Sequence, residues 1–331
     1  MFTWPSFYYP TTAVFVDDNK SFLTALKNRL PDNLPTKLFT NPLLALDDIK
    51  SQENYNLKNQ NNIRFFENDF NETDNFQLNN SNQLLVELRY DIFTKALYEI
   101  QRFSTQSIVI VDQLMPELDG ISFCEELKDI PIKKIMLTAN SDYAIAIEAF
   151  NNGIIDYYLS KDSPDLLPQL IQKIQVLQKK FFESEIECSM GCLLNLTAQI
   201  NDLSSLPFYE QVKKDLRATE YYLLDRWGSM LFITSEGIPT TLVISTSDTL
   251  DVFSKIADDQ DQLSTALLLS SRDHLLFFPS QADHMRPASE WSAFLHPAKP
   301  FPGKKDVYYS LISNLKSQPV DIKRIKPQIP L

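Results

Sequence analysis

Short apolar runs and helix-spaced apolar stripes alternate along the first half of the chain. The runs are rich in Val, Ile and Leu and have the length of buried strands: 12–17, 37–40, 107–112, 134–138 and 154–159. The stripes indicate helices: 21–30, 42–49, 84–103, 120–128 and 142–150, with a long one from Pro164. Strands that alternate with helices predict a parallel sheet covered on both faces. The pattern therefore predicts a doubly wound, five-stranded α/β fold.

One segment breaks this alternation. From Gln52 to Gln83 the composition changes, with eleven Asn between Asn54 and Asn82. Asn competes poorly for helix interiors, and so polar a tract has little to bury. We therefore expect an exposed loop or a disordered insertion at about 52–83, and its Phe residues leave a docked flap as the alternative.

The second half has a different pattern. Three short strands are predicted in succession, with turn residues between them: 220–225, 229–234 and 239–245. Two helices, a strand and a closing helix follow: 250–257, 262–269, 274–278 and 306–315. This succession predicts a smaller α+β module built on an antiparallel meander.

These patterns divide the chain into three parts. We predict a first domain over 1–178, a helical connector over 179–205, and an α+β domain over 206–331 that ends in a basic tail. The length of 331 residues favours more than one domain, because single cores stop growing near about 250–300 residues.

Composition narrows the class of protein. With 44% hydrophobic and 22% charged residues, the chain can bury a core. No stretch approaches the roughly 20 apolar residues of a membrane-spanning helix, so no membrane partner is expected. The three cysteines do not suit a disulfide scaffold, and Met1–Pro10 lacks the pattern of a secretory signal. Both observations favour a reducing, cytoplasmic location.

Charge is unevenly distributed. The net charge of −12 argues against a surface that coats nucleic acid as a whole. Residues 299–331 nevertheless carry seven bases against two acids. The residues considered as nucleic-acid contacts are Lys304, Lys305, Lys323, Arg324 and Lys326, with Phe301, Tyr308 and Tyr309 as stacking partners. A solvated cationic end is the alternative, and we favour it.

Acidic side chains follow two of the predicted strands. Asp17 and Asp18 come after the first strand, and Asp112 ends the third. These strands are neighbours in a doubly wound sheet, so the three carboxylates should converge at one edge. Like charges in a shared crevice are unfavourable unless a cation is present, and oxygen ligands suit Mg²⁺.

Two further strand ends complete a phosphoryl site. The fourth strand ends in Thr138, and Lys161 follows the fifth. In this arrangement Asp112 would attack phosphorus as the nucleophile, while Mg²⁺ and Lys161 would neutralise the developing charge.

Four motifs carry a resemblance to a known family: FVDDN (15–19), VDQLMPELDG (111–120), LTA (137–139) and YLSK (158–161). Together they resemble the receiver domain of two-component response regulators, which implies a flavodoxin-like fold over about 12–178. The resemblance implies these roles: Asp112 as phosphoacceptor, Asp17, Asp18 and the backbone carbonyl of Leu114 as Mg²⁺ ligands, Thr138 as switch hydroxyl, Tyr158 as switch aromatic, and Lys161 as the conserved lysine.

Two departures from the family pattern stand out. Receivers typically have Pro after the lysine, whereas Asp162 stands there in this chain, and the Asn-rich insertion makes this receiver unusually long. An aspartate-based phosphatase of the haloacid dehalogenase type is the alternative for this crevice. Such enzymes need a second acid two residues after the nucleophile, where this chain has Leu114, so we favour the receiver.

The output half carries no standard signature. The whole chain resembles response regulators of quorum-sensing systems. That resemblance implies phosphorelay from sensor histidine kinases or a phosphotransfer protein, control of growth-phase and virulence programmes, and phosphorylation-dependent homodimers. For the second half we prefer a binding module for nucleic acid or protein, controlled by phosphorylation. The alternative is an enzyme with a metal or hydrolytic site at His274, His284 and His296.

Overall fold

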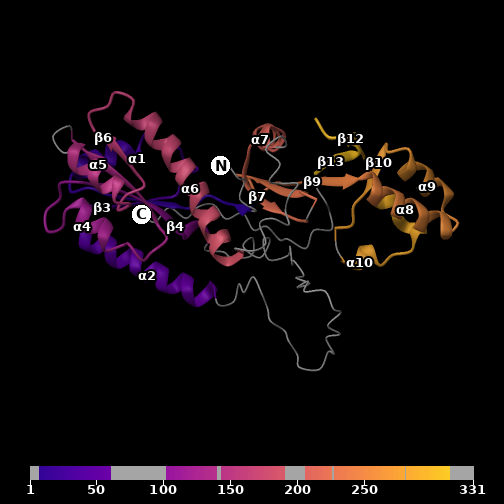
Figure 1. Cartoon of the computed structure of the whole chain (residues 1–331), viewed down its shortest axis with the longest axis horizontal. Coiled ribbons are helices and arrows are strands. Elements are labelled where there is room, and N and C mark those ends of the chain that lie inside the picture. The colour runs from indigo at the N-terminus through magenta and orange to yellow at the C-terminus, as the bar shows by residue number, and fades with distance from the viewer. Residues whose placement is uncertain are drawn as a thin grey trace, which may run out of the picture.

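The computed structural model describes residues 7–60, 102–139, 143–190, 206–225, 227–279 and 281–313. Two larger sheets organise them. In Figure 1 a five-stranded sheet with its helices lies at one end of the molecule, and a six-stranded sheet with further helices extends towards the other. Within the described ranges, no helix is both long enough and apolar enough to cross a membrane.

The five-stranded sheet has the order β3-β2-β4-β5-β6, and all its pairs are parallel. Its strands are β2 (Thr12–Val16), β3 (Thr36–Phe39), β4 (Gln106–Asp112), β5 (Lys133–Thr138) and β6 (Tyr157–Ser160). Its helices are α1 (Lys20–Lys27), α2 (Pro42–Gln60), α4 (Gly120–Glu125), α5 (Tyr143–Asn151) and α6 (Leu166–Met190), with the 3₁₀ turn η2 (Arg102–Ser104) before β4. The predicted five-stranded α/β fold is confirmed.

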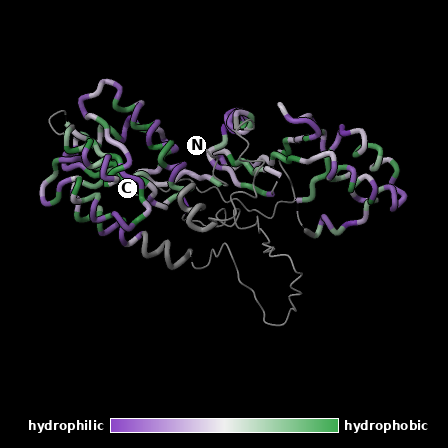
Figure 2. The backbone as a smooth tube through the Cα atoms, in the orientation of Figure 1, coloured by the Kyte–Doolittle hydropathy of each residue, from purple (hydrophilic) through white to green (hydrophobic). Residues whose placement is uncertain are grey.

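The central strands of this sheet bury both faces. In β2, Val14 and Val16 join a cluster with side chains of α2, α4 and α5, whereas Ala13 and Phe15 join a cluster with α1 and α6. A strand covered on both sides must be apolar at successive positions, which explains the continuous apolar runs in the sequence. Figure 2 shows these hydrophobic segments inside the parallel-sheet region and hydrophilic segments around it.

The first residues of the Asn-rich tract are helical, where the sequence predicted a loop or a disordered insertion. The helix expected at 42–49 continues to Gln60 as α2, so its last turns occupy the start of the Asn-rich tract. Three apolar residues of its first half are buried in the core. A helix nucleated there propagates at low cost even through Asn, whose helix penalty is about 0.7 kcal/mol or less. Residues 61–101, which include most of the tract and of the helix expected at 84–103, lie outside the described residues.

The six-stranded sheet is antiparallel, with the order β1-β7-β8-β9-β13-β12. Its strands are β1 (Phe7–Tyr8), β7 (Ala218–Leu223), β8 (Met230–Thr234), β9 (Pro239–Thr246), β12 (Lys299–Pro300) and β13 (Val307–Ser313). The other elements are α7 (Leu206–Asp215), α8 (Ser247–Asp259), α9 (Leu263–Ser270), α10 (Gln281–His284), the 3₁₀ segment η5 (Ala288–Phe294) and the pair β10 (His274–Leu276) with β11 (Leu295–Pro297). The predicted antiparallel meander is confirmed as β7-β8-β9.

The closing helix predicted at 306–315 is wrong. This segment forms β13, which pairs with β9 from Val307 opposite Thr246 to Ser313 opposite Thr240. Its last four residues alternate between buried and exposed, as a strand requires. Aromatic and β-branched residues favour strands, and the free edge of β9 satisfies the backbone hydrogen bonds of the segment. Strand propensity and pairing with β9 thus both favour a strand over the helix that the sequence pattern predicts.

The N-terminal strand belongs to the second sheet. Although β1 precedes the parallel sheet in the sequence, Phe7 and Tyr8 pair with Tyr222 and Tyr221 of β7. The rings of residues 7–9 surround Phe182 of α6 at centroid distances of 5.3, 5.6 and 4.8 Å. The N-terminal strand therefore connects the last helix of the parallel sheet to the edge of the antiparallel sheet.

A buried ion pair also joins the two sheets. Arg102 of η2 lies 3.0 Å from Glu220 of β7, and their side chains are 3% and 5% exposed. The hydroxyl of Tyr222 donates to the same carboxylate at 2.7 Å. Arg102 stands four residues before β4, so this contact lies at the start of the strand whose other end is Asp112.

Candidate functional site

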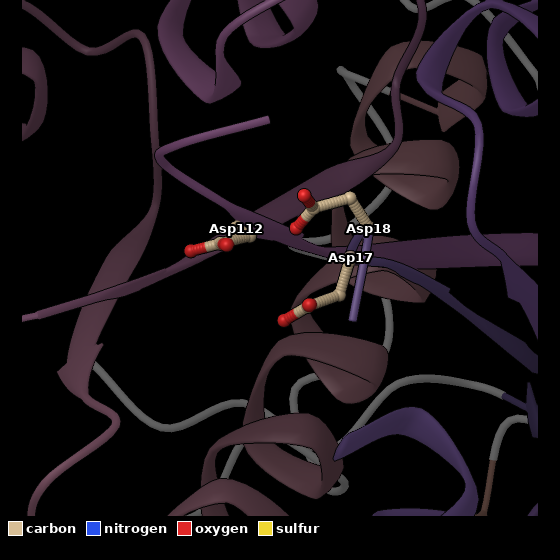
Figure 3. Close-up of side chains that lie close together, drawn as sticks. All are labelled: Asp17, Asp18 and Asp112. Atoms are coloured by element: carbon tan, nitrogen blue, oxygen red, sulfur yellow. The ribbon is translucent and has the colours of Figure 1, made fainter. Parts of the chain in front are cut away.

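Three carboxylates converge where the parallel strands end. Asp17 follows β2 directly, Asp18 comes next, and Asp112 is the last residue of β4. One ligand oxygen from each lies within 4.8 Å of the others. Figure 3 shows the three side chains directed towards one region. The structure thus brings together the acids that the sequence placed at this edge.

The environments of the three acids differ. Asp17 is 1% exposed and Asp112 is 7% exposed, whereas Asp18 is exposed. Asp17 accepts a hydrogen bond from the backbone N–H of Asn19 at 2.9 Å, and the Asn19 side chain in turn caps α1. The turn between β2 and α1 therefore fixes the orientation of the Asp17 side chain.

Lys161 connects the two buried acids. Its Nζ atom lies 2.7 Å from a carboxylate oxygen of Asp17 and 2.7 Å from one of Asp112. Its backbone N–H donates to the carbonyl of Thr138 at 2.9 Å, which ties the loop after β6 to the end of β5. Lys161 therefore reaches the carboxylates although Asp162 replaces the usual Pro.

The pKa values of this pair follow from burial and contact. Burial raises the pKa of Asp112, and the hydrogen bond and charge of Lys161 only partly oppose that shift. Burial alone would lower the pKa of Lys161, but its contacts with Asp112 and Asp17 outweigh burial and raise it. The lysine is therefore held in its charged form beside the acids.

The donor set fits a hard divalent cation. The Oδ2 atom of Asp17 is buried and makes no hydrogen bond of good geometry, although Lys161 Nζ is near it. Three clustered carboxylates with one lysine leave excess negative charge in the crevice. Oxygen donors of this kind form the acidic pocket that is typical of Mg²⁺ binding.

The two predicted switch residues lie on the neighbouring strands β5 and β6. Thr138 ends β5, is fully buried, and donates its hydroxyl to the carbonyl of Ala139 at 3.1 Å. Tyr158 of β6 is partly buried and packs edge-on against Phe150 of α5 at 6.1 Å. Leu114 lies in the loop after β4 with an exposed side chain, and its carbonyl as a metal ligand stays a prediction.

Gly120 allows the loop after β4 to close tightly. A Cβ atom at this position would lie 2.4 Å from the carbonyl oxygen of Asp112, which is a steric clash. The N–H of Gly120 also donates to the carbonyl of Gln113 at 3.0 Å. Any larger residue at position 120 would therefore displace the end of β4.

The predicted output residues do not form a comparable group. Within the described ranges, the only group of three or more metal-ligating side chains is the Asp17–Asp18–Asp112 group, so the three histidines form none. Phe301 is 3% exposed and packs in the core, which makes it unavailable for stacking with a base. Lys304 is partly exposed and Lys305 exposed, whereas Lys323, Arg324 and Lys326 lie outside the described residues.

Sequence analysis missed one feature of the second half. A cavity lies beside β9 and α8, lined by aromatic side chains that include Trp227, Phe253 and Phe278. The Trp of RWG at 226–228 and the two Phe of HLLFF at 274–278 are the signal that could have pointed to it.

Residues 75–175 match the family model described as the response regulator receiver domain. With the parallel sheet and the strand-end acids, this match identifies the first part of the chain as the receiver domain of a response regulator of a two-component system. The β2 strand and the two acids that follow it precede the matched range.

Along nearly its full length, the chain is similar to the Legionella pneumophila response regulator LqsR. The two are 27% identical, the TM-score is 0.70, and the match covers 94% of this chain and 90% of LqsR. Curated relatives include the probable transcriptional regulators ycf27 of Guillardia theta, 32% identical over 137 residues, and Galdieria sulphuraria, 30% identical over 137 residues. These matches cover 40% of this chain and 50% and 51% of the relatives, so the chain spans about half of their length.

Proposed function

We propose that this response regulator accepts a phosphoryl group on Asp112. The observation that carries this proposal is the position of Lys161 Nζ, 2.7 Å from both Asp17 and Asp112 at the ends of adjacent strands. An ammonium so placed can transfer its contact from the carboxylate to an oxygen of the incoming phosphoryl group. The donors in this proposal are sensor histidine kinases or a phosphotransfer protein.

The transfer step needs nucleophile, metal site and counter-charge together. A carboxylate oxygen of Asp112 attacks phosphorus, and the bond to the leaving group breaks with its electron pair on the donor. Asp17, Asp18, Asp112 and the Leu114 carbonyl would hold Mg²⁺, which when bound stabilises the charge on the phosphoryl oxygens. Lys161 and the Thr138 hydroxyl would also contact those oxygens.

The structural consequence that we propose is dimerisation. Movement of Thr138 and Tyr158 would alter the face formed by β5, β6, α5 and α6. On α5 this face exposes Ile147 and Phe150, which are 42% and 45% exposed and stand three residues apart on the same side of the helix. An apolar patch on a monomer surface is typical of an interaction site. Pairing of two copies through this face would bury it.

For the second half we propose a regulated binding module for nucleic acid or protein, in the domain arrangement 1–178, 179–205 and 206–331. The ycf27 relatives are described as probable transcriptional regulators, which favours nucleic acid. The similarity to LqsR supports a role as a response regulator. A place in a quorum-sensing phosphorelay in the cytoplasm is the finer proposal, and it rests on the resemblance of the sequence. An enzyme under phosphorylation control is the alternative, and the lack of a three-ligand histidine group within the described residues weighs against it.

Incubation of the full chain with acetyl phosphate tests the phosphoacceptor. We expect the intact mass to rise by one phosphoryl group with Mg²⁺ and not with EDTA, and the bond to be acid-stable and base-labile. Asp112→Asn should abolish the increase. Asp129→Asn is the matched control, because it makes the same change at an exposed position outside the carboxylate group. Undiminished phosphorylation of Asp112→Asn would overturn the proposal.

A further inference from the structure

An aromatic cavity lies in the second half, far along the chain from the phosphorylation site. Its volume is about 420 Å³, within the range of small-molecule sites. It is bounded by the turn after β7, the end of β9, the first turns of α8 and the segment after β10. Four aromatic residues line it: Trp227, Phe253, Phe277 and Phe278.

The walls come from two separate parts of the core. Trp227 packs with the cluster that contains α7, whereas Phe253 and Phe278 belong to the cluster that contains α8 and α9. Phe253, Phe278 and His284 meet edge to face, with interplanar angles of 70° and 75°. This corner of rings is held by mutual packing, so the cavity has a preformed aromatic wall.

Asp225 supplies the one carboxylate at the cavity. Its Oδ1 atom accepts hydrogen bonds from the backbone N–H groups of Trp227 at 2.8 Å and Ser229 at 3.0 Å, so the side chain is fixed in place. Burial raises the pKa of Asp225, and these hydrogen bonds oppose only part of that rise. Its position therefore depends on the turn and not on a counter-ion.

Among the described residues, no Lys or Arg side chain pairs with the carboxylate of Asp225. It forms no ion pair with any described residue, and no described Lys or Arg lines the cavity. A carboxylate taken from water normally requires a compensating positive charge. An aromatic enclosure favours a cation of low hydration, because the negative faces of the rings attract it.

We propose that this cavity binds a small organic cation of the alkylammonium or quaternary ammonium class. The aromatic rings would contact the apolar substituents, and Asp225 would neutralise the charge. The volume of the cavity suits a free small molecule. The inference is independent of phosphorylation at Asp112, because none of its residues belongs to the receiver.

Ligand titration of the full chain tests this proposal. Choline and benzyltrimethylammonium, at concentrations up to the millimolar range, should change the tryptophan fluorescence of the chain and raise the thermal unfolding midpoint. The matched probe is 3,3-dimethyl-1-butanol, which has the shape of choline without its charge. We expect it to bind at least about tenfold more weakly. Equal binding of the neutral probe, or no binding of either cation, would overturn the proposal.

Variants locate the binding. Asp225→Asn keeps an oxygen that can accept the two backbone hydrogen bonds and removes the charge, so choline affinity should fall about tenfold. Phe278→Leu should weaken binding through loss of one ring. Phe294→Leu is the control, because Phe294 contacts Phe278 at 5.2 Å and is absent from the cavity lining. Unfolding midpoints of all three show whether each variant folds, and unchanged affinity in a folded Asp225→Asn contradicts the role of the charge.

Discussion

Asp119 shows how a single residue shapes the loop that follows β4, the strand that ends in Asp112. Its carboxylate accepts hydrogen bonds from the N–H groups of Ile121 and Ser122 at 3.0 Å and from the Ser122 hydroxyl at 2.8 Å. It thereby caps α4, satisfying N–H groups that a helix start leaves unpaired. The next residue, Gly120, makes the close approach to Asp112, so cap and close approach act together to position the site.

Removal of this cap should have a pH-dependent cost. Burial alone would raise the pKa of Asp119, but the hydrogen bonds from Ser122 and Ile121 outweigh it and lower the pKa below 3.8. The stabilisation is therefore present at neutral pH and is lost as pH falls through the pKa of the folded state. We expect Asp119→Ala to cost about 1 kcal/mol at pH 7 by urea unfolding, and less in acid.

The control for this prediction is Asp119→Asn, because Asn caps nearly as well without a charge. It should retain most of the stability at pH 7. An Asp119→Ala cost that persisted unchanged at a pH well below 3.8 would contradict the role of the ionised carboxylate.

At the scale of elements, parallel pairing explains why the site forms at all. β2 and β4 are adjacent and in register from Ala13 opposite Ile108 to Val16 opposite Val111, so the residues that follow them meet. β5 and β6 continue the series and bring Thr138 and the loop of Lys161 to the same edge. Residues nearly 150 positions apart in the sequence thus become neighbours through strand order alone.

The α5 face gives an element-scale prediction. Ile147→Glu places a charge in the proposed contact while leaving the core intact, since Ile147 is 42% exposed. Sedimentation with beryllofluoride and Mg²⁺ should show a dimer for the unchanged chain and a monomer for this variant, because a buried unpaired charge is strongly unfavourable at an interface. Ile238→Glu is the control, with the same change at a 49% exposed site in the β8–β9 turn. A dimer that survives Ile147→Glu and dissociates with Ile238→Glu would place the contact on the second sheet.

At the scale of the whole molecule, the two sheets are joined by specific buried contacts. Arg102 and Glu220 form their ion pair out of water, and β1 inserts its aromatic rings between α6 and β7. Lys179 of α6 also lies 3.0 Å from Glu210 of α7. Helix α6 contributes to both the proposed dimer face and this junction. We therefore expect a conformational change at the dimer face to alter the contacts at the junction.

The ion pair at the junction should be strongly coupled. Arg102→Met leaves Glu220 buried without its counter-charge, and we expect a loss of about 3–5 kcal/mol in the free energy of unfolding by urea. The double variant Arg102→Met with Glu220→Gln should recover part of this loss, since it leaves no isolated charge. Glu290→Gln, in the surface pair with Arg286 at 2.8 Å, is the control and should cost well under about 1 kcal/mol. Similar costs for the buried and the surface pair would show that the junction is not tightly packed.

The sequence by itself determined the parallel sheet and the acids at its edge. Both depend on local signals, namely continuous apolar runs between amphipathic stripes and polar residues directly after them, so strand ends could be assigned without coordinates. The receiver motifs around Asp17, Asp112, Thr138 and Lys161 could be found for the same reason. Their roles follow from position along each strand and not from distant contacts.

Only the tertiary structure decided the rest. β13 became a strand because the free edge of β9 pairs with it, and the two residues of β1 joined a sheet more than 200 positions away. The Arg102–Glu220 pair and the aromatic cavity likewise combine residues from distant elements. Such contacts leave no local pattern, because hydrogen bonding between strand edges and desolvation of side chains depend on which elements meet in space.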